Sequence, residues 1–281
     1  MVKRNLTREE AIRKIITYVF AVIAATLIIF PYAWIVLASF QNWIDAVTLP
    51  PFPVRMVRWT LDNYIYNLSF STLPKAIADS AIVAIFSAII VVTMCAWAAY
   101  AMSKIRFKGR DVLYNLIIIL YMIPGLPMLI PIVVLFKQFG LLDTLLGLIL
   151  AHGIILIPLM TWFLVGVFDS VPKDLDEAAQ IDGLSRFFTI IRVNMPLVKA
   201  GLALILVFSF TISWNELMFS NTIGIVNTPM LQPVILDYLL GTRVQFAQAA
   251  AGGVISSLPI VVLAYLLQRY IISGIMKGAI K

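Results

Sequence analysis

The segment from Val171 to Pro196 reads VPKDLDEAAQIDGLSRFFTIIRVNMP and places seven charged side chains between two long apolar runs. Its pattern predicts two short helices. Pro172 suits a first helical turn, Gly183 suits the left-handed residue that ends a helix, and Ser185 suits the cap of the next helix. Pro196 is expected to stop the second helix. Helices this short are marginal in water, where about 12–15 residues are needed, so we expect the segment to dock on another surface.

The first of these helices offers a small, charged docking face. Leu175, Ala178, Ala179 and Gly183 fall near one side, because residues three and four apart are helical neighbours. Two alanines permit a close approach, and Glu177 lies beside them as a charge for an Arg or Lys on a partner. An amphipathic connector resting on lipid headgroups has the same spacing. The spacing therefore leaves both interpretations open.

The composition is that of an integral membrane protein. Hydrophobic residues make up 62% of the 281 residues and charged residues only 12%, which excludes an ordinary soluble domain. The lone cysteine, Cys95, lies in an apolar run, which excludes a disulfide framework or a cysteine metal site. The lone histidine, His152, also lies in an apolar run, where an interhelical hydrogen bond is its expected role, ahead of transport chemistry.

Six runs with few or no charges are long enough to cross a bilayer, which takes about 20 residues. The fifth is short, and we expect it to extend past Glu216 into Leu217–Ile225. Pro124, Pro127 and Pro131 are expected to break or kink the third. The sequence thus predicts an all-α integral membrane protein with six transmembrane helices, at Ile15–Ile44, Ser80–Met102, Val112–Phe136, Thr144–Phe168, Ala200–Asn215 and Val244–Gln268.

The distribution of Lys and Arg predicts the orientation. With the N-terminus inside, 16 of the 21 Lys and Arg residues fall on the cytoplasmic side. The net charge of +7 is explained by this topology and requires no nucleic acid. The predicted parts are a cytoplasmic N-terminus (1–14), an uncleaved first anchor (15–44), an extracytoplasmic linker (45–79), a five-helix core (80–268) that contains the cytoplasmic 170–196 loop, and a cytoplasmic tail (269–281).

Polar residues inside the spans are costly and tend to face an interior or a cavity. The strongest such cluster suits a sugar in a substrate pathway, through hydroxyls, amides and an indole face, and comprises Ser213, Trp214, Asn215 and Glu216. Alternatively, Glu216 lies at the outer interface. Asp79 is expected to cap a helix at the outer face. The outer segment 218–243 is polar and broken by prolines.

The 170–196 segment resembles the EAA loop of permease subunits in binding-protein-dependent ABC importers. The resemblance rests on Glu177-Ala178-Ala179, Asp182-Gly183 and Met195-Pro196-Leu197; Ala200 departs from it, since relatives often have a second proline there. It implies an ABC importer type I permease fold whose coupling helix inserts into a groove of a cytoplasmic ATPase. The implied coupling residues are Asp176, Glu177, Ala178, Ala179, Asp182 and Gly183. The family also uses an outer loop to reach the binding protein, here around Gly224, Asn227 and Thr228.

The C-terminal residues from Gln268 to Lys281 resemble the end of carbohydrate-type permeases, the group of the smaller six-span subunit of the maltose transporter. An Asn63-Tyr64 pair before the core is also usual there. The resemblance implies import of a mono- or oligosaccharide across a prokaryotic cell membrane. The implied partners are a second permease, two ATPase subunits that carry ATP and Mg, and an extracytoplasmic solute-binding protein. No cofactor or metal is expected on this chain.

The motifs that the chain lacks bear on its possible functions. The chain has no glycine-rich phosphate loop ending in Gly-Lys-Ser/Thr, so we expect it not to hydrolyse ATP itself, and no catalytic residues are predicted. An importer of glycerol phosphate or a polyol shares the same pattern. A secondary transporter is compatible with hydropathy alone, but internal repeats and mid-span ionisable groups would be expected. A membrane-embedded enzyme lacks a catalytic constellation, such as an HExxH motif.

Overall fold

The computed structural model describes residues 8–42, 45, 59–241 and 244–279. Parts of the predicted N-terminus (1–7), linker (46–58) and tail (280–281) lie outside the described residues. The regular elements in the described parts are helices, namely α1 (Arg8–Ser39), α3 (Asp62–Ser69), α4 (Leu73–Lys104), α5 (Arg110–Met122), α6 (Gly125–Gln138), α7 (Leu145–Asp169), α8 (Asp174–Ile181), α9 (Arg186–Thr189), a π-helix η1 (Ile190–Asn194), α10 (Met195–Leu197), α11 (Lys199–Trp214), α12 (Met218–Ile223), α13 (Leu231–Leu240) and α14 (Phe246–Ala279).

The predicted all-α, six-span class is confirmed by helix length and composition within the described residues. Four helices are long and apolar enough to cross a membrane, and the number is six if each of two bent helix pairs is one span. The continuous spans are Ile12–Ser39, Leu73–Lys104, Leu145–Asp169 and Phe246–Leu266; the bent pairs are Arg110–Met122 with Gly125–Gln138, and Arg186–Leu197 with Lys199–Trp214. The chain divides into a smaller unit (1–71 and 238–255) and a larger unit (72–237 and 256–281).

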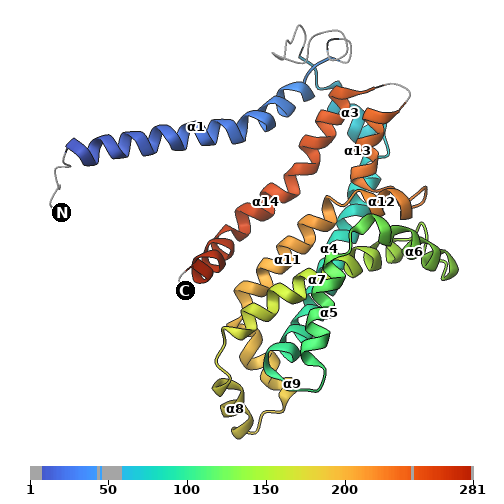
Figure 1. Ribbon diagram of the computed structural model, residues 1–281. Helices are drawn as coiled ribbons and strands as arrows, with labels where there is room; N and C mark the ends of the chain where they lie inside the picture. Colours follow the sequence, from blue (N-terminus) through green and yellow to red (C-terminus); the bar gives the residue numbers. More distant parts are fainter. Residues whose placement is uncertain (1–7, 43–44, 46–58, 242–243, 280–281) are drawn as a thin grey trace. The chain divides into compact units, whose positions relative to one another are not determined.

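The third predicted span is not one straight helix. It breaks at Ile123 and Pro124, and α5 and α6 meet at 99°. Ile123 has the extended backbone that a following proline imposes, with ψ 121°. Pro127 falls in the first turn of α6, where its missing N–H breaks no helical hydrogen bond. Proline sterics therefore decide where the span bends, so that α6 runs across the bundle rather than along it (Figure 1).

The fifth predicted span also differs from the sequence-based expectation. We expected it to continue past Glu216, but α11 ends at Trp214 and α12 is a separate short helix that begins at Met218. At its other end the chain turns by 80° at Val198, two residues after Pro196. Pro196 itself lies inside the three-residue helix α10, so the predicted stop falls slightly later than expected.

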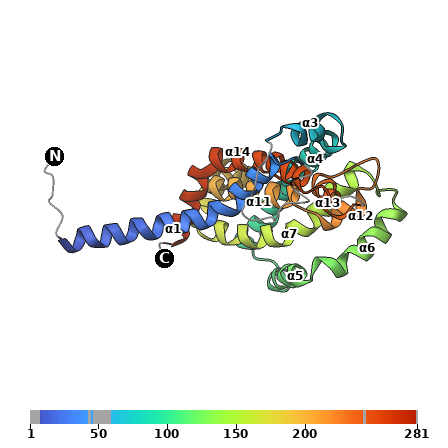
Figure 2. The ribbon, with the colours of Figure 1, turned by 90° about the horizontal axis from the view of Figure 1, so that it is seen from above.

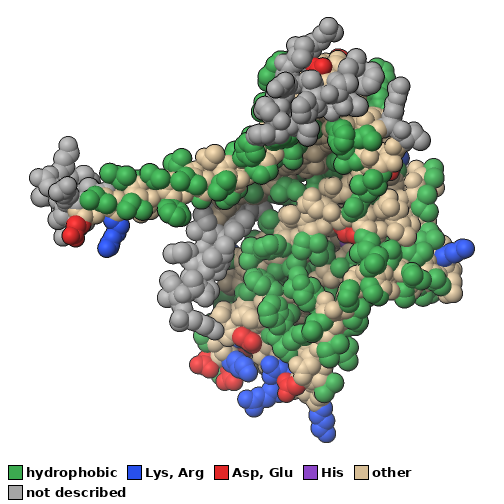
Figure 3. Space-filling view, turned by 45° about the horizontal axis from the view of Figure 1, so that its top comes forward, with side chains coloured by type: hydrophobic (Ala, Val, Ile, Leu, Met, Phe, Trp, Pro, Cys, Tyr) green, Lys and Arg blue, Asp and Glu red, His purple; other side chains and the backbone are tan. Residues whose placement is uncertain are grey.

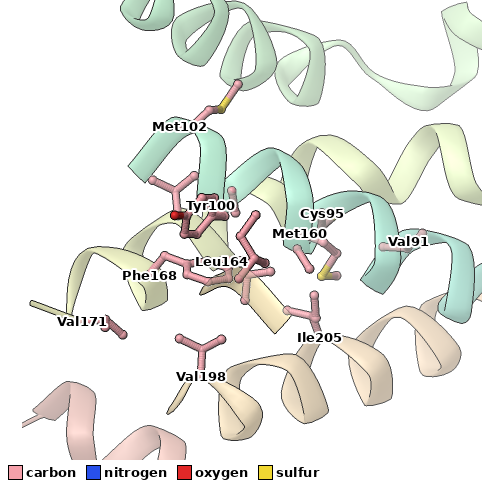
Figure 4. Close-up of a cluster of buried hydrophobic side chains, with 14 of the residues drawn as sticks. Val91, Cys95, Tyr100, Met102, Met160, Leu164, Phe168, Val171, Val198 and Ile205 are labelled. Carbon is pink, nitrogen blue, oxygen red and sulfur yellow. The ribbon is translucent and has the colours of Figure 1, made fainter. Parts of the chain in front are cut away.

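Helices α4, α7 and α11 form the core of the larger unit and run side by side (Figures 1 and 2). A cluster of buried side chains from all three fills the space between them, including Tyr100, Leu164, Phe168 and Ile205 (Figure 4). The rings of Tyr100 and Phe168 meet edge to face, with centroids 5.9 Å apart. A second buried cluster joins α4, α6, α7 and α12. Between them, the two clusters tie together most of the helices of the larger unit.

Asp79 does not cap a helix, so the sequence-based expectation for it is wrong. Helix α4 begins at Leu73, because Pro74 is favourable in a first turn, and this places Asp79 well inside the helix. Asp79 is 8% exposed, and its carboxylate forms an ion pair with Lys75, one turn earlier, with the two charged atoms 2.5 Å apart.

The smaller unit is organised by the Asn63-Tyr64 pair. The buried Asn63 amide donates hydrogen bonds to the carbonyls of Ser39 (2.9 Å) and Gln41 (2.8 Å) at the end of α1. The Tyr64 hydroxyl lies 2.6 Å from the hydroxyl of Ser39, and the Tyr64 ring contacts Phe40. The pair therefore holds the start of α3 against the end of α1.

The close contact between α7 and α11 gives a stability prediction. A Cβ built on Gly201 would lie 2.7 Å from Val167 Cγ1, whereas a Cβ on Gly166 would meet nothing within 4 Å. Overpacking of this kind typically destabilises by about 1–3 kcal/mol. We expect Gly201→Ala to lower the melting temperature of the purified protein in detergent, and Val167→Ala to restore it in the double variant. Gly166→Ala is the control and should leave the melting temperature unchanged or raise it. Equal melting temperatures for Gly201→Ala and Gly166→Ala would contradict the close packing of Gly201 on Val167.

Candidate functional site

The 170–196 segment forms the predicted pair of short helices at one end of the larger unit, where α8 and α9 lie (Figure 1). Helix α8 has Asp174, Asp176 and Glu177 in its first turn, where the positive end of the helix dipole favours carboxylates. Ser185 is the residue before α9, as expected, although its side chain accepts no capping hydrogen bond. The second helix is not regular, because α9 passes into the π-helix η1 before α10.

Gly183 ends α8 as the sequence predicts. Its φ is +87°, in the left-handed region that glycine adopts readily and other residues do not. Two backbone hydrogen bonds close the turn, from Leu184 N to Ala179 O (3.0 Å) and from Gly183 N to Gln180 O (3.1 Å). This is the Schellman arrangement of a helix C-terminus. The turn therefore depends on the glycine backbone and not on space, since a Cβ at Gly183 would meet nothing within 4 Å.

One face of α8 packs on its own chain. Asp176 and Ala179 are each 6% exposed. The Asp176 carboxylate accepts a hydrogen bond from the side-chain amide of Asn194, at the end of η1. Asn194 is fully buried and also donates to the carbonyl of Thr189. Of the six predicted coupling residues, Asp176 and Ala179 thus serve to hold α8 in place.

The opposite face of α8 is open. Glu177, Ala178, Asp182 and Gly183 are exposed, and so is Ile181 at 86%. Residues 177, 178 and 181 share one side of the helix by their three- and four-residue spacing. A small residue between an acid and a branched apolar side chain gives a shallow surface that a partner can approach closely.

The segment is held against the core by α4. The indole of Trp97 stacks on Phe187 of α9, with centroids 5.2 Å apart and planes 19° from parallel. Ser103 donates to Asp169, and Lys104 donates to the carbonyl of Val171, just after α7. The C-terminal ends of α4 and α7 and the 170–196 segment are therefore joined by direct contacts.

Charged side chains gather at this end of the larger unit, beside a surface that is mostly hydrophobic (Figure 3). Lys104, Arg106, Lys173 and Arg186 line a cleft together with Asp176 and Glu177. The guanidinium of Arg192 lies over the Phe188 ring, 4.9 Å from its centroid. Such a concentration of ionic groups at one end of an apolar bundle marks the limit of the membrane-spanning part.

A buried polar cluster lies where α7 meets α11 and α12. His152 is 1% exposed, and its Nδ1 lies 2.6 Å from the hydroxyl of Ser213. Its Nε2 lies 3.3 Å from the hydroxyl of Ser220 and 3.4 Å from a carboxylate oxygen of Glu216. Glu216 also accepts the backbone N–H groups of Phe219 and Ser220. The expected interhelical hydrogen bond of His152 is confirmed.

The four predicted pathway residues have different surroundings. Ser213 and Trp214 are buried, and the Trp214 indole donates to the carbonyl of Ser256. Glu216 faces His152 and the start of α12. The side chain of Asn215 is exposed, and its Oδ1 lies 3.3 Å from the amide nitrogen of Gln232.

The predicted loop residues Gly224, Asn227 and Thr228 lie together at the opposite end of the larger unit from α8. There the loop after α12 wraps around Asp143, which precedes α7. We did not predict the roles of Asp143, Asn194 and Lys75 from the sequence, although they hold these elements. An aspartate directly before a capping threonine, as in Asp143-Thr144, is a weak signal for such a role. Among the residues that the structure describes, no group of three or more His, Cys, Asp or Glu is placed to hold a metal ion.

The Asp176–Asn194 contact gives a prediction about the rigidity of the 170–196 segment. Asn194→Leu removes the amide donor of a buried carboxylate, a loss that typically costs about 1–3 kcal/mol. We expect faster tryptic cleavage at Arg186 and a lower melting temperature. The double variant Asp176→Leu with Asn194→Leu should recover much of the loss, because both polar partners are then removed. Asp174→Asn, on the exposed side of α8, is the control; equal cleavage rates in Asn194→Leu and this control would contradict the prediction.

Comparisons with known proteins agree with the fold. Residues 92–277 match the family described as binding-protein-dependent transport system inner membrane component. The chain is 32% identical to the trehalose/maltose transport system permease protein MalG of Thermococcus litoralis, over 98% of this chain and 99% of that protein. It is 30% identical to the galactooligosaccharides transport system permease protein GanQ of Bacillus subtilis, over 96% of each chain.

The fold is also similar to a chain in the crystal structure of a bacterial ABC transporter that imports the acidic polysaccharide alginate. The TM-score is 0.72 at 21% identity, and the similarity covers 95% of this chain and 99% of that one. This likeness shows the fold. Together with the apolar helices, the matches make the chain a multi-pass membrane protein and a transport component rather than a catalytic subunit. The chain belongs to the family of inner membrane components of binding-protein-dependent transport systems.

Proposed function

We propose that this chain is one of two permease subunits of an ATP-driven importer, and that the imported solute is a sugar. The proposed coupling to the ATPase subunits rests on the exposed face of α8 at Glu177 and Ala178, in a segment that is anchored to α4 and α7. The sugar is supported by the relatives, which include a trehalose/maltose and a galactooligosaccharide permease. ATP and Mg are then bound by two separate ATPase subunits, and a solute-binding protein delivers the sugar from outside.

The orientation that we propose puts both termini and the 170–196 segment in the cytoplasm. It is supported by the excess of Lys and Arg in the segments on that side. The 224–229 loop then faces outward and is proposed to contact the binding protein. Asn215 is proposed to line the pathway beside Gln232, since amides suit sugar hydroxyls. Ser213, Trp214 and Glu216 are proposed to hold this part of the pathway in place through their contacts with His152, Ser256 and α12.

The topology is tested by labelling single cysteines from outside intact cells, in a Cys95→Ser background. Lys137→Cys should react with an impermeant maleimide, and Arg186→Cys should react only after the membrane is made permeable. Both positions are exposed in the chain, so access depends on the side of the membrane. Strong labelling of Arg186→Cys in intact cells, with none at Lys137→Cys, would reverse the proposed orientation.

The coupling role is tested with Glu177→Ala and Gly183→Val. Glu177 is exposed, so its loss leaves the packing of α8 intact but removes a charge-assisted contact with a partner, typically about 1.5–3 kcal/mol. Gly183→Val strains the turn at φ +87° and displaces the α8 face, so the effect should be larger. We expect both variants to reduce copurification of the ATPase and sugar uptake in the same membranes, with normal insertion.

The matched control is Asp111→Ala, which removes an exposed acid from the first turn of α5. It should leave ATPase copurification and uptake unchanged. Wild-type copurification and uptake in Gly183→Val would mean that α8 does not couple this chain to an ATPase.

A further inference from the structure

Asp143 occupies a constrained position between α6 and α7. Its φ is +54°, which makes it the non-glycine residue with a left-handed backbone among those described. Aspartate tolerates this conformation better than most residues. Its own N–H donates to the carbonyl of Ile223, at the end of α12 (2.8 Å). Thr144 then caps α7 by accepting the N–H of Gly147. The backbone of Asp143 is thus fixed to the first turn of α7 and to α12.

The Asp143 carboxylate accepts hydrogen bonds from the backbone N–H groups of four consecutive residues. The shortest distances are 2.9 Å to Ile225, 3.1 Å to Val226, 2.9 Å to Asn227 and 3.1 Å to Thr228. The Asn227 amide (2.9 Å) and the Thr228 hydroxyl (3.0 Å) donate as well. Successive N–H groups that converge in this way form an anion-binding nest. Here the anion is a side chain of the same protein, and we call this arrangement the Asp143 clamp.

The clamp requires an ionised carboxylate, and the surroundings keep it ionised. Partial burial raises the pKa of Asp143, but the backbone donors lower it by more, so that the pKa lies well below its usual value of 3.8. A pKa lowered on folding contributes stability that is fully present above the usual value and is lost only as the pH falls through the lower folded value. The loop is therefore held at every physiological pH.

The other side of the 224–229 loop is tied to α4. Lys75 donates to the carbonyl of Asn227 (2.6 Å) and pairs with Asp79 one turn later. Ser80 accepts the N–H of Leu231, just beyond the loop (2.9 Å). Gly224 begins the loop where a Cβ would lie only 2.5 Å from the carbonyl of Thr228. The loop is therefore held between the N-terminal part of α4 and Asp143, which precedes α7.

Only side chains at the tip of the loop are left to meet a partner. Ile225 is 62% exposed and Val226 is 76% exposed, whereas their N–H groups are bonded to Asp143. A partner therefore meets a preformed apolar tip, whose backbone N–H groups are already bonded. A push on the tip is delivered to the N-terminal parts of α4 and α7. At their other ends, Ser103 of α4 donates to Asp169 of α7, and Lys104 of α4 donates to the carbonyl of Val171 in the 170–196 segment.

We infer that Asp143 is a positioning residue that makes the 224–229 loop move as one body with α7 and α4, so that contact with the binding protein is transmitted toward α8. The inference rests on the proposed function. A rigid attachment passes on a displacement, whereas a loop free to rearrange absorbs it. The substrate pathway and the ATPase surface contain no part of the clamp.

The inference is tested with two variants and a control. Asp143→Gly removes the carboxylate but adopts a positive φ without strain. Asp143→Asn keeps the size and tolerates the same backbone while removing the charge, and it guards against a folding defect in the glycine variant. Asp237→Asn, an exposed aspartate of α13, is the matched control.

The first measurement concerns the chain itself. A nitroxide on Val226→Cys, in a Cys95→Ser background, should give a restricted spectrum in the assembled complex and in Asp237→Asn. It should become mobile in both Asp143 variants, more so in Asp143→Gly. A label on Leu146→Cys, exposed in the first turn of α7, should be unchanged in all of them. A label at position 226 that stays restricted in Asp143→Gly would show that Asp143 does not hold the loop and would overturn the inference.

The second measurement is ATP hydrolysis by the complex, with and without the solute-binding protein that copurifies with the wild type. We expect the stimulation to fall at least about fivefold in the Asp143 variants, the lower limit of a typical coupling effect, with an unchanged basal rate. If the loop is mobile in the Asp143 variants but the binding protein still stimulates ATP hydrolysis fully, the inferred transmission toward α8 is overturned. Absence of stimulation in the wild type would instead refute the proposed function, while the label at position 226 still decides whether the clamp exists.

Discussion

The packing of α4 on α7 is the interaction on which the larger unit depends. Between two apolar helices in lipid, close van der Waals packing and interhelical hydrogen bonds supply the association, because lipid is as apolar as the side chains. Ala88 and Ala151 are buried at this contact with almost no exposed surface. Ser87 donates to the carbonyl of Ile149, and Thr161 donates to the sulfur of Cys95. These small and weakly polar groups let two long helices approach and keep one register.

The backbone is irregular outside the packed pair of α4 and α7. At each break, nearby groups satisfy the polar groups of the backbone. Pro124 has no N–H group, but it directly precedes α6, where such a group would make no helical hydrogen bond. At the break after α11, Glu216 accepts the first N–H groups of α12 and lies against His152 of α7. Broken helices are tolerated in a membrane when neighbouring groups replace the lost hydrogen bonds. The bends are therefore fixed features of the bundle, and their angles follow from these contacts.

The same kind of device anchors the functional segments at both ends of the frame. At one end, the buried carboxylate of Asp176 holds α8 through the amide of Asn194. At the other, Asp143 holds the 224–229 loop through its backbone N–H groups. In each case a carboxylate is bonded by donors from another part of the sequence, and for the buried Asp176 these donors offset the cost of burying its charge. Each segment consequently keeps its shape with one face left open.

The class of the protein can be predicted from its sequence, because the features that define the class depend on local chemistry. Runs of apolar residues must be helices in lipid, whatever they pack against. Gly183 marks the end of α8 because a positive φ is a property of one residue and its neighbours. The Glu177-Ala178-Ala179 pattern likewise sits in a single short segment, so its family resemblance was visible without coordinates.

The partner of each polar side chain, in contrast, is set by how the helices pack. Asp143 lies 82 or more residues from the loop that it holds, and Asp176 lies 18 residues from Asn194, so no local pattern links them. Asp79 was misassigned because a helix start depends on the whole first turn, and Pro74 moved that start earlier than the charge pattern indicated. Glu216 had two expected positions, and its orientation in the fold depends on His152 of another helix. Hydrogen-bond partners distant in sequence are chosen by packing, and packing is a property of the folded chain alone.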